Sequence, residues 1–174
     1  MGATALLAPG ALAAQSSAAE LQLNAGCYVN FGRHVATVLV AGRGFNPSSD
    51  VIIGGGVFAD NVKTDTLGNF LAKVKAPNAT INPGARKFKV TASTENFDTN
   101  QKITAQVFGH YTVGGVALSA STAGFGKRLT YTFGGFRPGK HIYGHYFVNG
   151  RSTGRKDFGK AKAPCGTRKT KATG

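Results

Sequence analysis

A short motif occurs twice in this chain of 174 residues, at positions 91 residues apart. The first copy is Gly44-Phe45-Asn46-Pro47 and the second is Gly135-Phe136-Arg137-Pro138. Apolar residues in the flanking segments match at the same spacing, namely Val38 with Leu129, Val40 with Tyr131, and Val51 with Ile142. A repeat of about 90 residues has the size of a small β-sandwich and is too long for a solenoid repeat. The sequence therefore predicts two copies of one small domain.

The end of the repeat is less regular. Pro83-Gly84-Ala85-Arg86-Lys87 matches Cys165-Gly166-Thr167-Arg168-Lys169, but at an offset of 82. At that offset the strand expected over 103–107 has its counterpart beyond Gly174. We therefore expect the second copy to lack its closing strand. Either the gene product is truncated, or another protein supplies that edge by strand addition.

Apolar residues alternate with polar ones over much of the first copy, as they do in strands with one buried face. Phe70-Ala72-Val74 and Phe88-Val90-Ala92 are clear examples, and about seven short strands are expected between residues 21 and 107. The chain has 25 Gly, one Met and no Trp, and no segment has a helical period, which argues against a helical bundle. We expect an all-β fold of packed sheets.

Two strands and one turn are expected in the second copy. Leu129, Tyr131 and Phe133 alternate with threonines, and a further strand covers 141–148. Asn149-Gly150 follows it, and both residues tolerate the positive φ of a type I′ hairpin turn. On the second strand, the residues expected to face the core are Ile142, Tyr146 and Val148.

Parts of the first copy resemble bacterial immunoglobulin-like repeats of secreted and cell-surface proteins. These parts are 38–47, 64–70, Pro77 and Pro83-Gly84. The resemblance covers about residues 21–111 well and 115–172 less well. It implies two immunoglobulin-like β-sandwich units in tandem, over 20–113 and 114–174, the second incomplete. It also implies a role as spacer, adhesion or binding unit, and no catalytic residues, because the matching motifs form turns and core.

Residues 1–19 are similar to the end of a secretory signal peptide. An Ala- and Leu-rich run precedes Pro9-Gly10, and small residues of the Ala-x-Ala type follow. A disordered Ala-rich start is the alternative. No other apolar run approaches the roughly 20 residues that span a bilayer, so no transmembrane segment is expected. We expect a secreted or cell-surface protein.

Positive charge is concentrated in the second copy. The net charge is +14, of which residues 20–113 hold +3 and residues 114–174 hold +11, with Asp157 as the single acidic residue in that half. Such a surface favours an anionic neighbour, and an envelope polymer or polysaccharide, an acidic lipid surface and nucleic acid all remain open. Nucleic-acid binding through residues 127–171 is the alternative to a structural or envelope-binding role.

Two groups of residues are candidate binding sites. The first is an anion- or glycan-binding face in which aromatic residues alternate with histidines and basic residues, made of Lys140, His141, Tyr143, His145, Phe147 and Arg151. The competing interpretation is that the histidines are simply exposed and that Tyr143 and Phe147 pack under a loop or against the first domain. The second is a basic C-terminal patch made of Lys160, Lys162, Arg168, Lys169 and Lys171.

Catalytic and metal chemistry lack a sequence signature. His141 and His145 have no obvious third ligand, and no nucleophile motif or phosphate-binding loop occurs. Cys27 and Cys165 are the only cysteines, so one disulfide is possible, with two free thiols as the alternative. We expect a non-enzymatic interaction module without metal or cofactor.

Overall fold

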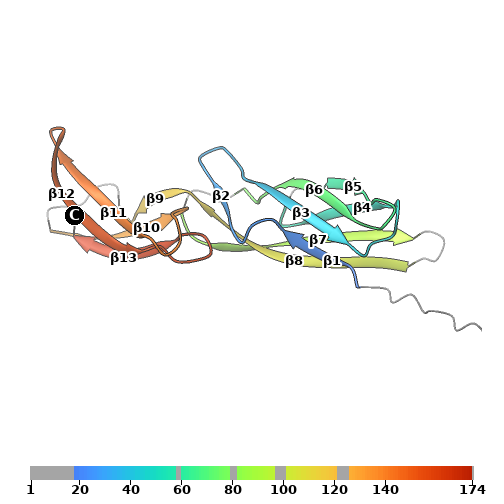
Figure 1. The fold of residues 1–174 in the computed structure, drawn as a ribbon. Coiled ribbons are helices and arrows are strands. Elements are labelled where there is room, and N and C mark those ends of the chain that lie inside the picture. The colour runs from blue at the N-terminus through green and yellow to red at the C-terminus, as the bar shows by residue number, and fades with distance from the viewer. Residues whose placement is uncertain (1–17, 58–59, 79–81, 97–100, 121–125, 174) are drawn as a thin grey trace, which may run out of the picture.

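A computed structural model describes residues 18–57, 60–78, 82–96, 101–120 and 126–173. These residues form thirteen β-strands and no helix, so the all-β prediction is confirmed. Figure 1 shows the strands gathered in two units placed end to end, with β1–β8 in the first and β9–β13 in the second. Nearly all of the signal-like segment 1–19 lies outside the described residues and stays a prediction.

The first unit consists of two sheets that share one core. The strands are β1 (Glu20–Leu23), β2 (Tyr28–Asn30), β3 (Thr37–Arg43), β4 (Asp50–Gly55), β5 (Asp60–Lys63), β6 (Phe70–Lys75), β7 (Arg86–Asn96) and β8 (Gln101–Val113). One sheet has the order β1-β3-β6 and the other the order β2-β8-β7-β4-β5. All neighbours are antiparallel except β2 and β8, which are parallel.

Alternation along the strands builds this core. On β6, Phe70, Ala72 and Val74 are buried while the residues between them are exposed, as the sequence predicts. Val38 and Val40 of the smaller sheet and Val51, Ile53 and Val90 of the larger one belong to the same buried cluster. Each sheet therefore buries its one apolar face against the other.

The second unit also consists of two sheets, with fewer strands. Its strands are β9 (Gly115–Leu118), β10 (Arg128–Gly134), β11 (His141–Val148), β12 (Arg151–Lys160) and β13 (Arg168–Thr173). One sheet has the order β13-β10-β9, and β11 pairs with β12 in the other. The core is small and comprises Phe133, Ile142, Phe158, Ala161 and Ala172, with the rings of Phe133 and Phe158 4.9 Å apart.

The two units share a turn that fixes how they correspond. In the first, the Phe45 N–H donates to the Gly68 carbonyl at 3.1 Å; in the second, the Phe136 N–H donates to the Gly166 carbonyl at 3.2 Å. Both glycines have positive φ, 77° and 61°. Gly166 is thus the counterpart of Gly68, 98 positions earlier, and the sequence match of 165–169 with 83–87 is wrong.

This correspondence shows which strands the second unit contains. β9, β10 and β13 take the places of β1, β3 and β6, and the β11–β12 hairpin takes the place of β4 and β5. Within the part of the chain that the structure describes, nothing takes the places of β2, β7 and β8. The second unit therefore differs from the first by more than one closing strand.

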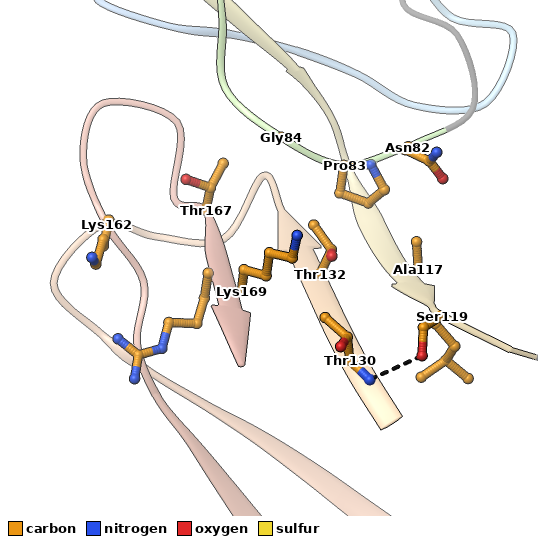
Figure 2. Close-up of a pocket in the computed structure, with 12 residues that line it drawn as sticks. Asn82, Pro83, Gly84, Ala117, Ser119, Thr130, Thr132, Lys162, Thr167 and Lys169 are labelled. Atoms are coloured by element: carbon orange, nitrogen blue, oxygen red, sulfur yellow. Dashed lines mark hydrogen bonds between the residues drawn. The ribbon is translucent and has the colours of Figure 1, made fainter. Parts of the chain in front are cut away.

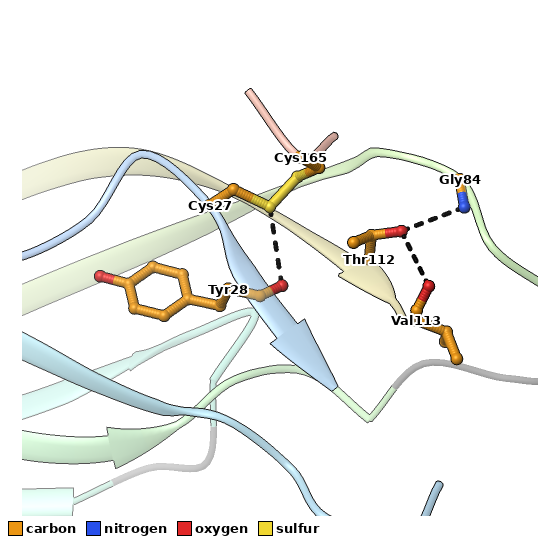
Figure 3. The surroundings of a disulfide bond; sticks show 6 residues. All are labelled: Cys27, Tyr28, Gly84, Thr112, Val113 and Cys165. Atoms are coloured by element: carbon orange, nitrogen blue, oxygen red, sulfur yellow. Dashed lines mark hydrogen bonds between the residues drawn. A yellow bond between two sulfur atoms is a disulfide. The ribbon is translucent and has the colours of Figure 1, made fainter. Parts of the chain in front are cut away.

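Two covalent connections join the units. β8 continues through Gly114 into β9, and a disulfide joins Cys27, between β1 and β2, to Cys165, between β12 and β13. Figure 3 shows this bond beside the end of β8, where the Thr112 hydroxyl accepts a hydrogen bond from the Gly84 N–H at 3.1 Å. The pairing that the sequence left open is therefore present, and it crosses the junction between the units.

Candidate functional site

The β11–β12 hairpin carries most of the residues that the sequence singled out. Asn149 and Gly150 form its turn with φ of 49° and 76°, which confirms the predicted hairpin. The pairing is irregular between His141 and Tyr143 and again between Tyr146 and Phe147. Figure 1 shows the turn projecting from the end of the second unit. Both faces of the outer hairpin are consequently accessible.

One face of this hairpin is a row of exposed rings and charges, which we call the ribbon face. It comprises His141, Tyr143, His145 and Phe147 on β11, with Lys160, Asp157 and Arg155 opposite them on β12. The rings of His141 and Tyr143 are stacked with centroids 5.9 Å apart, and Cζ of Arg155 lies 4.5 Å from the Tyr143 ring centroid. Tyr143 is therefore held at the surface by a cation–π contact rather than covered by a loop.

The one carboxylate of this face is already engaged. Asp157 accepts hydrogen bonds from the Gly159 N–H and from His141 Nδ1, each at 2.7 Å. The Gly159 hydrogen bond, the His141 side chain and the nearby Arg155 charge lower the pKa of Asp157, and partial desolvation opposes them. Asp157 thereby orients His141 and leaves the other cations without an acidic partner on this face.

The remaining residues of the predicted face lie around its ends. Lys140 precedes β11 and is exposed, while Arg151 pairs with Val148 and so lies on the opposite side of the hairpin. On that side Ile142 is buried, as predicted. Tyr146 and Val148 are 37% and 59% exposed, so their prediction as core residues is wrong. Tyr146 lies against Tyr131 of β10 but is only partly covered, and Val148 lies next to the hairpin turn.

A groove of about 730 Å³ lies where the two units meet. Figure 2 shows the loop containing Asn82 and Pro83 at one end of the groove, above the sheet formed by β9, β10 and β13. Four hydroxyl and three basic side chains contribute to its lining, which consists of Asn82, Pro83, Gly84, Ala117, Leu118, Ser119, Thr130, Thr132, Lys162, Thr167, Arg168 and Lys169. No acidic residue contributes to this lining.

The strand register explains why hydroxyls and lysines share the groove. Thr132 pairs with Lys169 and Thr130 with Lys171, so their side chains emerge on the outer face of the sheet. Ser119 Oγ accepts a hydrogen bond from the Thr130 N–H at 3.0 Å and fixes the β9 side. The arrangement suits an anion that also carries hydroxyl groups.

The predicted basic C-terminal patch is divided between these two surfaces. Lys162, Arg168 and Lys169 line the groove, and Lys171 lies on the same sheet face beside Thr130. Lys160 instead pairs with His141 and belongs to the ribbon face. Arg168 is oriented by a hydrogen bond from its Nε to the Phe158 carbonyl at 3.1 Å.

Sequence reasoning missed Arg155 and the contribution of the Asn82-Pro83 loop. The strand period offered a signal for Arg155. Arg155 and Asp157 follow the recognised hairpin turn and are two residues apart, so on a strand their side chains lie on the same face. The loop gave no such signal, since its position depends on how the two units meet.

Known proteins supply no further guide to this site. Comparisons with protein-family models, with curated proteins and with solved structures found no match to the chain. Among the described residues, no three His, Cys, Asp or Glu side chains are grouped as a metal site would require. The same residues include no helix long and apolar enough to cross a membrane.

Proposed function

We propose that this chain is a non-enzymatic, secreted or cell-surface interaction module that binds an anionic envelope polymer through the ribbon face. The environment of Tyr143 carries the proposal: its exposed ring is stacked with His141 and lies under the Arg155 guanidinium. An aromatic face can stack on the apolar face of a sugar, and neighbouring cations attract phosphate or carboxylate groups. A polymer that alternates sugars or polyols with anionic groups meets both requirements.

The strand order of the first unit supports an immunoglobulin-like assignment. Its β1-β3-β6 sheet corresponds to strands A, B and E of an immunoglobulin sandwich, and β8-β7-β4-β5 corresponds to G, F, C and C′. The second unit repeats the A, B, C, C′ and E positions. The Cys27–Cys165 disulfide supports an exported location, because such bonds persist in oxidising compartments.

Titration of a fluorescent glycerol-phosphate polymer that carries hexose side groups with the oxidised chain, followed by anisotropy at low and moderate salt, tests the function. Binding should weaken as salt rises, because the Lys and Arg side chains release counterions from the polymer. Absence of binding even at low salt contradicts the proposal.

A matched pair of variants separates a specific face from net charge. Replacing Lys140, Arg155 and Lys160 by Gln removes three exposed cations on or beside the ribbon face, and replacing Lys63, Lys73 and Lys87 by Gln removes three exposed cations from the first unit. At roughly 0.2–1 kcal/mol per exposed cation, the ribbon-face variant should bind about threefold to a hundredfold more weakly. Equal weakening in the control variant would show attraction to overall charge and no defined site.

Tyr143→Ser tests the stacking contribution by itself. It leaves the net charge unchanged but removes the ring beneath Arg155. Weaker polymer binding with an unaltered salt dependence is expected. If Tyr143→Ser changes only the salt dependence of binding and leaves the affinity at low salt unchanged, a stacking role for this ring is contradicted.

Nucleic acid is the second candidate, because residues 114–174 hold twelve Lys and Arg against one Asp. Residues 127–171 would then contact phosphates, with Tyr143 and Phe147 stacking on bases. A labelled DNA duplex and a single strand in the same titration distinguish the two. Tighter binding to DNA than to the glycerol-phosphate polymer, at equal salt, favours this alternative.

A further inference from the structure

The β11 strand has one partner where its counterpart has two. In the first unit β4 pairs with β5 on one side and, through Ile52–Gly55, with β7 on the other. At the 91-residue offset the equivalent positions in β11 are Tyr143–Tyr146, yet β11 pairs only with β12 in the described part of the chain. This edge of β11 therefore presents backbone N–H and C=O groups with no strand beside them.

Apolar side chains on the core side of the other sheet are also uncovered. Val116 and Leu118 of β9 pair with Phe133 and Tyr131, so they emerge on the core side of their sheet. They are nevertheless 51% and 48% exposed, whereas Leu21, on the equivalent strand β1, is only 7% exposed.

The first unit shows what covers such residues. There, β7 contributes Phe88, Val90 and Ala92, all buried in the shared core. In the second unit Tyr146 and Val148 lie on the same face of β11 as the buried Ile142, yet both are exposed. A strand in the place of β7 would both pair with the edge and shield these side chains from water.

The charges of the second unit indicate the chemistry of that strand. Lys156 pairs with Gly144 and Arg151 with Val148, so both basic side chains emerge beside the uncovered apolar residues. Both are exposed, and neither forms a salt bridge with another residue that the structure describes. An acidic strand is attracted to this surface, whereas the same surface of a second copy is repelled by like charge.

We propose that the free edge of β11 accepts an acidic β-strand from another protein. The strand pairs with Tyr143–Tyr146 of β11, as β7 pairs with β4 in the first unit. Its carboxylates lie near Arg151 and Lys156. Its apolar side chains cover the exposed apolar residues Val116, Leu118, Tyr146 and Val148. This surface is separate from the ribbon face, since side chains on opposite faces of a strand alternate. It does not depend on polymer binding.

The probe is a peptide that copies β7, residues 86–96, with Arg86, Lys87 and Lys89 replaced by Glu. Two control peptides are the unaltered β7 sequence and a scrambled acidic sequence of the same composition, which lacks the alternation. Backbone amide hydrogen exchange of the full oxidised chain is measured with each peptide at millimolar concentration. The acidic copy should slow exchange over 143–146 at least tenfold, and both controls should slow it less.

A pair of chain variants locates the contact. Leu118→Lys with Val148→Lys should abolish the protection, while Ile52→Lys, which changes an exposed residue of the first unit, should leave it intact. No protection by the acidic copy, or equal protection by the scrambled peptide, overturns the proposal. Dimerisation of the free chain with protected 143–146 amides also overturns it, because a second copy would then occupy the edge.

Discussion

Loss of the Cys27–Cys165 bond should destabilise the second unit far more than the first. The second unit has five buried apolar residues in its core cluster, against fifteen in the first. The bond closes a loop with a sequence separation of 138, so loop-closure entropy contributes roughly 5 kcal/mol to complete unfolding. If the first unit stays folded, the loop released is only about 50 residues, from 114 to 165, and the contribution falls to about 4 kcal/mol.

The assay compares wild type with Cys27→Ser/Cys165→Ser in urea, followed by hydrogen exchange so that each unit is observed separately. With a slope of about 1–2 kcal/mol/M, the midpoint of the second unit should fall by about 2–4 M. Amides of 88–92 in the first unit serve as the internal reference. The reduced wild type should match the double variant.

Two results refute this reasoning. One is a second unit whose stability changes by less than about 1 kcal/mol, which is well below the loop-closure value. The other is an equal loss in both units, because the bond would then support a single cooperative structure.

Three further outcomes follow from individual contacts. Gly166→Ala should destabilise the second unit by more than the roughly 1–2 kcal/mol that a left-handed backbone costs an alanine, because the new Cβ also meets the Phe136 carbonyl. Gly150→Ala has open space around its Cβ and should show only the backbone effect. Thermal unfolding of both variants measures the difference. Phe133→Ala should remove about 3–5 kcal/mol from the second unit, measured by urea unfolding, and an effect below 1 kcal/mol contradicts its core role. Because the pKa of Asp157 is lowered in the folded state, its carboxylate stabilises the hairpin at pH values above the ordinary aspartate pKa near 3.9, and this stabilisation is lost as the pH falls through the folded-state pKa. The chemical shift of the Gly159 amide in an NMR pH titration should report this step. Asp157→Asn should abolish it.

The sequence was most informative where one residue type decides a local conformation. Alternation placed Phe70, Ala72 and Val74 on the buried face, because a strand with one covered side must alternate. Asn149-Gly150 identified its hairpin, because both residues accept positive φ. Features of this kind depend on neighbours in the chain and so can be recognised without knowing the fold.

Features that depend on distant contacts were not predictable. The match of 165–169 with 83–87 rested on a shared glycine and basic residues. In the fold, Gly166 instead corresponds to Gly68, because its carbonyl accepts a hydrogen bond from the Phe136 N–H as the Gly68 carbonyl does from the Phe45 N–H. Tyr146 fits the strand period as well as Ile142 does, but it is only partly covered whereas Ile142 is buried. The same limit applies to the candidate site: alternation placed Tyr143 on the ribbon face, and only the fold shows Arg155 above it.

The disulfide also determines how the chain would carry mechanical load. Tension between residues 18 and 173 passes from 18 to Cys27, across the sulfur–sulfur bond, and from Cys165 to 173. The intervening segment, which includes nearly all of both cores, lies in a closed loop that this force cannot extend while the bond is intact. At about 3.4 Å per residue that loop would add roughly 470 Å of extension if the bond were absent. The oxidised protein is therefore a short, nearly inextensible link, and reduction of one bond converts it into a long extensible one.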